Sequence, residues 1–545
     1  MRWFGWGEEG SSTAELPEAA ARLLRERLRA GDRRTPPVAL EDVRLPEPAL
    51  SGDALAALRQ AMGEEHVRQD REARVSHAAG RSYPDLVRLR SGDGSGAPDA
   101  VMYPADRDQV AAVLRACNDA GVAVVPFGGG TSVVGGVEAL RGEHSAAIAL
   151  DLSRMDALLE TDRTSLSATF QPGITGPRAE TLLASRGLTL GHYPQSFEFA
   201  TIGGYVATRS AGQASTGYGR IDELVLGLRC ATPSGELEVK PFPATAAGPS
   251  LLELVMGSEG TLGVITEATL GVRPLPEASR YEGWSFRSFE DGCRGFREME
   301  QAGASPDVAR LSDRQETALS IALASSGSLT ERAGRAYLRL RGHEGGCLAV
   351  LGFEGGEREI DQRRNRVSEI LHDADGLPLG ERPGRAWLRG RYSGPYLRDS
   401  LLDRGVMAET LETAATWSNL PALYAAVGDA LRASLSERGT PPIVMCHVSH
   451  LYRSGASLYY TFIAAQEQGA ELDQWRAAKR AASDAIVSHG GTITHHHAVG
   501  RDHAPWMRAE VGELGLAVLR AAKERLDPRG IMNPGKLLPD RGLQS

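Results

Sequence analysis

The segment at residues 126–136, Pro-Phe-Gly-Gly-Gly-Thr-Ser-Val-Val-Gly-Gly, has the composition of a backbone phosphate-binding loop. It follows the apolar run at residues 122–125, which predicts a strand. Glycine has no Cβ, so this chain can bend sharply and approach a ligand closely. Successive amides that point into one concavity bind phosphate oxygens. The segment therefore predicts a site for a phosphate-bearing cofactor.

Two further segments combine glycine with hydroxyl side chains: residues 195–214 read QSFEFATIGGYVATRSAGQA, and residues 257–265 read GSEGTLGVI. Together the three segments predict a cofactor that lies across several stretches of backbone. No Gly-Lys-Ser or Gly-Lys-Thr occurs, which excludes a Walker-type loop. The formal Gly-x-Gly-x-x-Gly at residues 5–10 follows no strand, so a Rossmann fold is not favoured.

The second chemical feature is the run His495-His496-His497, with His447 and His450 upstream. The residues before the run are strand-like, so we expect a strand in which His495 and His497 share one face and His496 points to the other. Imidazoles in this spacing can ligate a divalent ion, or they can transfer protons and bind an anionic substrate. No carboxylate stands at a matching spacing, so we assign no metal.

Two arginines and a pair of tyrosines stand where they could face a pocket. Arg310 interrupts an apolar run, as a buried cation would, and Arg398 has Asp399 beside it. Tyr459 and Tyr460 are neighbours in an apolar strand. Because side chains alternate along a strand, one ring can face a pocket while the other packs in the core.

The elements that must position these residues divide the chain into four regions. Residues 1–97 show helical periodicity, and residues 98–276 predict one α+β unit. Residues 277–504 predict a second, α/β unit, and residues 505–545 contain one helix and an irregular tail. The expected strands are residues 101–103, 122–125, 148–152, 166–170, 224–231, 236–239, 263–272, 348–353 and 458–463. The expected helices are residues 19–28, 55–67, one beginning after Asp106, 176–187, 250–256, 356–371, 420–436, 472–488 and 513–526.

Composition excludes several classes of protein. The net charge of −9 argues against broad nucleic-acid binding, and no apolar run is long enough to span a bilayer. Five scattered cysteines without a Cys-x-x-Cys predict neither a disulfide framework nor a zinc ribbon. A reducing cytoplasm fits this cysteine usage. The amino terminus lacks a secretory signal, and the carboxyl terminus lacks the peroxisomal Ser-Lys-Leu.

Four ordered motifs carry a family resemblance: PFGGGTS, FATIGGYVATRSAG, GSEGTLGVITEATLGVRPLPE and DPRGIMNPGKLL. They resemble the vanillyl-alcohol oxidase / p-cresol methylhydroxylase flavoproteins. That resemblance implies FAD, bound by a two-part α+β domain, with a separate α/β cap domain over the flavin. Further segments, RWFGWG, ARLSD, YLRD, CHVSH and HHHAVG, are similar to the alkyldihydroxyacetonephosphate synthase family and cover nearly the whole chain.

The resemblance implies roles for individual residues. Tyr459 would donate a proton, Arg398 would bind a substrate phosphate, Arg310 would be needed for activity, and His495, His496 and His497 would lie beside the flavin. The residues 126–136 contain no histidine, so FAD would be held without a covalent histidyl bond. The implied FAD-binding residues are Pro126, Gly128, Gly129, Gly130, Thr131, Ser132, Val133, Gln195, Ser196, Thr201, Gly203, Gly204, Thr208, Arg209, Ser210, Ala211, Glu259, Gly260, Thr261, Leu262, Gly263, Val264 and Ile265.

The reaction implied by the resemblance is redox-neutral: the acyl group of an acyl-dihydroxyacetone phosphate is exchanged for a fatty alcohol through a flavin N5 adduct, giving an ether-lipid precursor. The alternative is an FAD-linked oxidoreductase acting on a 2-hydroxyacid or alcohol. The implied partners are a lipid-like or hydroxyacid substrate, a second copy of the chain in a homodimer, and a membrane surface that the protein contacts peripherally. No nucleic-acid partner is implied. The expected location is the cytoplasm, with membrane association.

Overall fold

The computed structural model describes the chain except residues 9, 11–21, 23–24, 29–33, 325–327 and 540–545. Its first sheet has four strands in the order β1-β2-β4-β3, in which β2, β4 and β3 run parallel. The helix between β2 and β3 is α5: the Asp106 side chain caps its first turn, and Gly121 ends it with a φ of 66°. The bounds are β1 Val67–Arg68, β2 Ala100–Met102, α5 Arg107–Ala120, β3 Val122–Phe127 and β4 Ala146–Asp151.

The second sheet has five antiparallel strands in the order β5-β6-β10-β8-β9. Its bounds are β5 Leu158–Asp162, β6 Ser167–Phe170, β8 Val225–Thr232, β9 Gly235–Val239 and β10 Val264–Gly271. A short pair, β7 Leu188–Thr189 and β11 Arg273–Pro274, lies outside it. The helices that accompany these strands are α6 Gly176–Ala184, α7 Ile202–Thr208, α8 Ser215–Tyr218, α9 Ile221–Leu224 and α10 Leu251–Val255.

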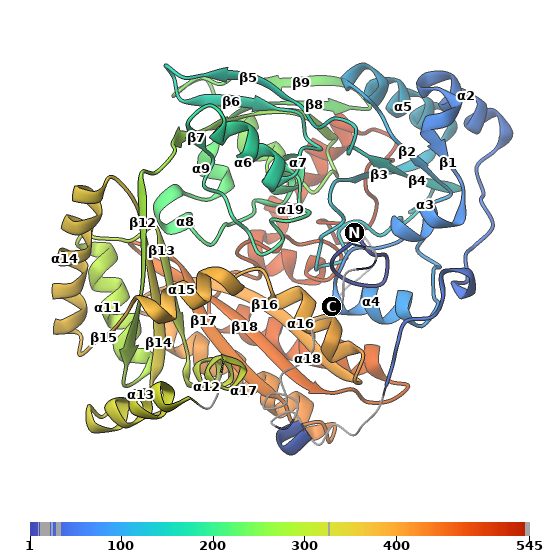
Figure 1. The fold of residues 1–545 in the computed structure, drawn as a ribbon. Helices are drawn as coiled ribbons and strands as arrows, with labels where there is room; N and C mark the ends of the chain where they lie inside the picture. Colours follow the sequence, from blue (N-terminus) through green and yellow to red (C-terminus); the bar gives the residue numbers. More distant parts are fainter. Residues whose placement is uncertain (9, 11–21, 23–24, 29–33, 325–327, 540–545) are drawn as a thin grey trace.

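The third sheet has seven antiparallel strands in the order β15-β12-β14-β13-β17-β18-β16. Its bounds are β12 Ala278–Phe286, β13 Val308–Ser312, β14 Cys347–Gly355, β15 Leu377–Gly380, β16 Val406–Thr416, β17 Ile443–Tyr452 and β18 Gly455–Ala465. The helices that contribute most to its main apolar core are α11 Phe289–Gln301, α14 Glu357–Asp373, α17 Leu420–Glu437 and α18 Glu471–Ser488. Figure 1 shows this sheet below the two smaller sheets.

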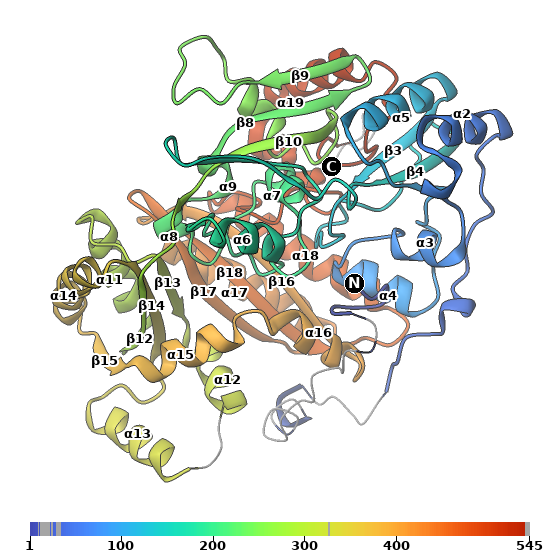
Figure 2. The same ribbon diagram turned by 45° about the horizontal axis from the view of Figure 1, so that its top comes forward.

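The remaining helices surround these sheets. They are η1 Leu40–Asp42, α2 Gly52–Met62, η2 Glu64–His66, α3 Arg71–Ser76, α4 Tyr83–Arg90, α12 Arg314–Ala324, α13 Leu329–Leu340, α15 Glu381–Gly390, α16 Gly394–Leu402, η3 Ala504–Trp506 and α19 Met507–Leu526. Helix α19 lies near β8 and β9 in Figure 2, and its backbone is broken at Gly512, where φ is 71°.

Most expected elements are confirmed; two are corrected, and one lies largely outside the described residues. The expected helix at 55–67 ends at Met62, because Gly63 takes a φ of 91°. The expected helix at 19–28 lies largely outside the described residues. The expected strand through His495–His497 is wrong: these residues form an irregular loop. In the described part of the chain, no helix has the length and apolarity to cross a bilayer.

Candidate active site

A cavity of about 480 Å³ lies where the cofactor loops face the seven-stranded sheet. One wall contains residues 128–133, 194–196 and parts of 200–213. The opposite wall comes from α12, α16, β13, β16, β17 and β18 and from the histidine loop. The structure therefore brings together the two groups of residues that the sequence suggested separately, the glycine-rich loops and the titratable side chains.

The first glycine loop is too crowded for side chains. A Cβ on Gly129 would lie 2.0 Å from the carbonyl oxygen of Phe199, and one on Gly128 would lie 2.5 Å from Thr201 Oγ1. Gly130 has a φ of 66°, in the left-handed region. The bare backbone at this edge of the cavity is the kind of cradle that a dinucleotide pyrophosphate requires.

Not every predicted cofactor residue lies on this cavity. Most of those in the first two segments line it. The exceptions are Pro126, Gly203, Arg209 and the whole segment 259–265. Arg209 instead pairs with Glu253 at 2.6 Å. The carboxylate of Glu259 accepts hydrogen bonds from the amides of Val499 at 2.9 Å and Gly500 at 2.7 Å. The third segment thus connects the end of the histidine loop to the α+β unit at residues 98–276 through hydrogen bonds.

The histidine loop is organised by a residue that sequence reasoning missed, Glu412 on β16. Its carboxylate accepts hydrogen bonds from the backbone amides of His495, His496 at 3.0 Å and His497 at 2.7 Å, and from the Thr494 hydroxyl at 2.7 Å. Because these amides point at one carboxylate, they cannot pair with a neighbouring strand, which explains the wrong strand prediction. The available signal was the pair of acidic residues, Glu409 and Glu412, within the largely buried strand 406–416.

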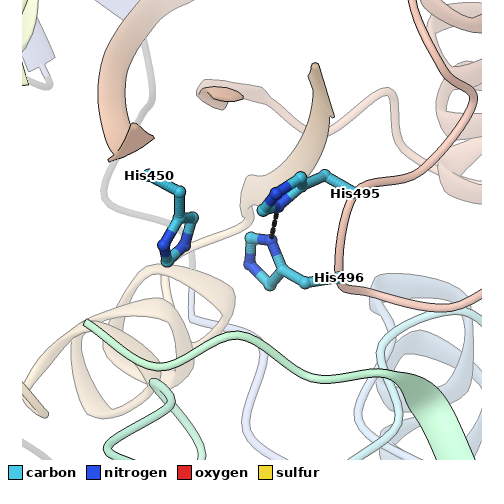
Figure 3. A group of neighbouring side chains, drawn as sticks. All are labelled: His450, His495 and His496. Carbon is cyan, nitrogen blue, oxygen red and sulfur yellow. Dashed lines mark hydrogen bonds between the residues drawn. The ribbon is translucent and has the colours of Figure 1, made fainter. Parts of the chain in front are cut away.

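Three imidazoles gather at one end of this loop. Figure 3 shows His450 opposite His495 and His496, and their candidate ligand nitrogens lie within 4.8 Å of one another. His495 Nδ1 and His496 Nδ1 are 2.9 Å apart, and His495 Nε2 is 2.6 Å from the Tyr452 hydroxyl. Burial lowers the pKa of each of these imidazoles, so they are neutral near pH 7. The positive charge of nearby Arg220 lowers these pKa values too, and neutral imidazoles of this kind can accept a proton or ligate a metal ion.

Tyr459 and Tyr460 alternate as predicted. Tyr460 is fully buried in the core, whereas Tyr459 lines the cavity. The Tyr459 ring stacks on His447 with centroids 4.8 Å apart and lies 5.3 Å from the His497 ring. Burial raises the pKa of Tyr459 to about 12, so its hydroxyl stays protonated at neutral pH and can donate a proton or a hydrogen bond.

Arg310 is half-buried and belongs to a triad with His447 and Glu316. Its guanidinium Nη2 is 2.7 Å from Glu316 Oε1, and its Nη1 is 3.0 Å from His447 Nε2. His447 Nδ1 also lies 3.0 Å from Glu316 Oε1. Burial alone would raise the pKa of Glu316, but Arg310 and His447 bring it well below its usual value. Glu316, which the sequence pattern did not reveal, therefore stays ionised and orients both partners.

Arg398, on α16, lines the cavity and has one side-chain donor without a partner. Its Nη1 donates to the carbonyl oxygen of Arg81 at 2.7 Å, and its Nη2 is 3.5 Å from Asp399 Oδ1. Its Nε is buried and has no hydrogen-bond partner within the described structure. A guanidinium in the wall of a cavity favours an anionic ligand, because its hydrogen bonds to an anion are charge-assisted.

Part of the wall of the cavity that contains Arg398 is apolar. The side chains that form this apolar wall are Leu319, Leu323, Leu397, Leu401, Met445 and Ile463. A substrate with an anionic head and an alkyl tail would find complementary surroundings for both parts in this single cavity.

Comparisons with known proteins agree with this geometry. Residues 98–239 match the family described as FAD binding domain, and residues 275–537 match FAD linked oxidases, C-terminal domain. The chain is 32% identical to an alkyldihydroxyacetonephosphate synthase of Dictyostelium discoideum, over 99% of this chain and 93% of that protein. It is 34% identical to an alkyldihydroxyacetonephosphate synthase of Trypanosoma brucei brucei, over 99% of this chain and 92% of that protein.

Solved structures point the same way. An alkyldihydroxyacetonephosphate synthase superposes with a TM-score of 0.86 at 30% identity, covering 98% of this chain and 99% of the other. p-Cresol methylhydroxylase shares the fold, with a TM-score of 0.67 at 14% identity over 92% of this chain and 100% of the other. The predicted fold class and the predicted FAD cofactor are confirmed, and the crowded glycine cradle fits the cofactor.

Proposed function

The chain belongs to the alkyldihydroxyacetonephosphate synthase family of FAD-dependent enzymes, and we propose from this that it exchanges the acyl group of an acyl-dihydroxyacetone phosphate for a fatty alcohol. The observation that carries the proposal is the cavity itself, in which the cation Arg398 shares the wall with apolar side chains and with neutral histidines. A phosphate head, an aliphatic tail and a carbon-bound proton would each meet a matching group there.

Most of the predicted site residues have a role in this proposal. Arg398 binds the substrate phosphate through its guanidinium fork. His496 or His497, neutral at pH 7, accepts the proton next to the substrate carbonyl. Tyr459 acts as a proton donor, and Arg310 holds the His447 ring in place. FAD, when bound, supplies an electron-accepting ring.

The FAD-binding residues and the division of the chain also remain proposals. Held without a covalent histidyl bond, FAD contacts the cavity-lining residues of segments 126–133 and 195–211, and segment 259–265 supports them from behind. We divide the chain into a helical region at 1–97, the FAD-binding domain at 98–276, a cap domain at 277–504 and a returning segment at 505–545. The two family matches, at 98–239 and 275–537, support the middle boundary.

The decisive experiment separates group exchange from oxidation. Purified holoenzyme is mixed anaerobically with acyl-dihydroxyacetone phosphate and a fatty alcohol, and separately with a panel of 2-hydroxyacids. We expect ether product and released fatty acid, with the flavin spectrum oxidised at the end. Lasting bleaching by a hydroxyacid, without ether formation, would instead identify an FAD-linked oxidoreductase.

We further propose that the enzyme is a homodimer that pairs through α19. This helix is apolar on two sides: Leu516 is fully buried, whereas Leu514 is 78% and Val518 59% exposed, with Ala517 and Ala521 exposed beside them. A helix that is apolar on both sides is typically covered on both. The part of α19 after the break at Gly512 begins with Glu513 and has Arg525 in its last turn, so antiparallel pairing of two copies brings opposite charges together.

Light scattering after gel filtration tests this pairing. We expect the native chain at twice 58.2 kDa. Leu514→Glu should be a monomer, because it buries a charge at the centre of the contact. Leu159→Glu, at a site 48% exposed on β5, is the matched control and should remain dimeric. The pairing of two copies would be contradicted if the native chain were a monomer or if Leu514→Glu remained a dimer. It would also be contradicted if Leu514→Glu lost binding to phosphatidylcholine vesicles, because the exposed face of α19 would then be a membrane contact.

For location we propose the cytoplasm with contact to a membrane surface. All five cysteines are free in the structure, and four of them are buried, as expected in a reducing compartment. Contact with a membrane would supply the lipid substrate that the apolar wall of the cavity accommodates.

A further inference from the structure

The amino-terminal residues 2–7, Arg-Trp-Phe-Gly-Trp-Gly, form a compact loop within the molecule. The amide of Arg2 donates to the carbonyl of Gly7 at 2.8 Å, and Arg2 Nε donates to the carbonyl of Trp6 at 2.9 Å. Arg2, Trp3, Gly5 and Trp6 are buried. Both Figure 1 and Figure 2 place the N-terminus near α4.

This loop is fastened to the residue next to Arg398. Asp399 is buried, and its Oδ2 accepts a hydrogen bond from the Trp6 amide and lies 3.4 Å from Arg2 Nη2. A Cβ on Gly5 would lie 2.3 Å from the same oxygen, so only glycine allows this approach. With Oδ2 engaged by the loop, Asp399 keeps only a 3.5 Å contact to Arg398 Nη2 through Oδ1.

The loop is also fastened to Arg81, which links it to both halves of the site. The buried guanidinium of Arg81 donates to the carbonyls of Gly5 at 3.1 Å and Arg2 at 2.7 Å. The Arg81 amide donates to the carbonyl of Ser132 in the cofactor loop at 2.6 Å, and its carbonyl accepts from Arg398. Burial, and to a smaller extent the charge of Arg398, lower the pKa of Arg81 to about 10.

The loop reaches the cavity itself through Trp6. Its indole lines the cavity, packs edge-on against Phe199 with centroids 5.3 Å apart, and donates from Nε1 to Glu198 at 3.3 Å. Trp3, in the same loop, packs instead in a separate apolar cluster with Val43 and Val75. The two tryptophans therefore offer a matched pair, one at the cavity and one away from it.

We propose that residues 2–7 are a positioning element of the substrate site. By engaging Asp399 and Arg81, the loop holds Arg398 in the wall of the cavity, where its guanidinium can bind an anion, and Trp6 forms part of the same wall. The inference rests on the proposed function in one respect: the anion is taken to be the phosphate of the substrate.

Binding measurements on the holoenzyme test this role. Calorimetric titration with dihydroxyacetone phosphate should show about tenfold weaker binding for Gly5→Ala, because the added methyl displaces Asp399. Trp6→Phe should weaken binding several-fold, and Trp3→Phe should leave it unchanged. The FAD absorbance and the melting temperature establish that each variant is folded and loaded. In turnover assays, Gly5→Ala should raise KM with little change in kcat.

Native affinity in both Gly5→Ala and Trp6→Phe would overturn the inference, as would equal weakening by Trp3→Phe, since that would indicate a general effect on the fold. A native enzyme that fails to bind dihydroxyacetone phosphate would overturn it too. Failure of the proposed function looks different: the native enzyme would bind the phosphate compound, with the same ranking of variants, but would form no ether product.

Discussion

Tyr459→Phe is expected to lower turnover by about 10²–10⁴-fold while FAD stays bound, the range typical for loss of a general acid or base. The substitution removes one hydroxyl and keeps the ring that stacks on His447 at 4.8 Å. Because burial raises the pKa of Tyr459 to about 12, the native hydroxyl is protonated throughout the working pH range and its effect is that of a donor. Initial rates of ether formation, normalised to flavin content, measure the loss.

The neighbouring tyrosine is a matched control for this prediction. Tyr460 points into the core, where its hydroxyl donates to the carbonyl of Tyr424 at 3.1 Å. Tyr460→Phe should cost about 1 kcal/mol of stability and leave the rate within about twofold of native. Comparable rates for the two variants would show that the hydroxyl at 459 takes no part in the chemistry.

These two tyrosines also show what could be predicted from sequence. Alternation along a strand is a local rule, so the opposite directions of Tyr459 and Tyr460 follow once the strand is recognised. The same holds for α5, where Asp106 and Gly121 mark both ends. Arg398 and Arg310 were identified through family motifs. In the structure, Arg398 has an Nε without a hydrogen-bond partner, and Arg310 has the carboxylate of Glu316 as its partner.

What sequence could not supply was the partners of these residues. Glu316 lies six residues from Arg310, but the contact depends on how α12 returns over β13. Glu412 lies more than eighty positions before the histidines it binds, on the strand that pairs with β18. A run of histidines after an apolar segment resembles a strand in sequence. Only the buried carboxylate of Glu412 shows that the backbone amides of the run turn towards it and not towards a neighbouring strand.

Glu412 is for this reason the subject of the second large expected effect. Its side chain is fully buried and accepts from three consecutive amides and one hydroxyl. In Glu412→Gln the shape is kept, but one acceptor oxygen becomes an amide that cannot accept. Loss of such a buried charge-assisted contact is expected to cost about 3–5 kcal/mol of unfolding free energy. The histidine loop should loosen, and turnover should fall by about 10²-fold or more.

The pH dependence of stability distinguishes this charge from a packing effect. Burial alone would raise the pKa of Glu412, but the histidines and their amides hold it well below its usual value. A carboxyl whose folded pKa is lowered stabilises the protein above its unfolded pKa, and this contribution disappears as the pH falls through the folded pKa. Urea unfolding at pH 7 and pH 4 should therefore show a larger difference between native and Glu412→Gln at pH 7.

Glu409, on the same strand, provides the opposite case. It accepts from the Trp475 indole at 2.7 Å, and burial raises its pKa instead of lowering it. Glutamine resembles the protonated acid, so Glu409→Gln should change stability less than Glu412→Gln, and the difference should not grow towards pH 7. If both variants lose the same free energy at both pH values, the ionised carboxylate of Glu412 is not what holds the histidine loop. The position of the imidazoles would then depend on packing alone.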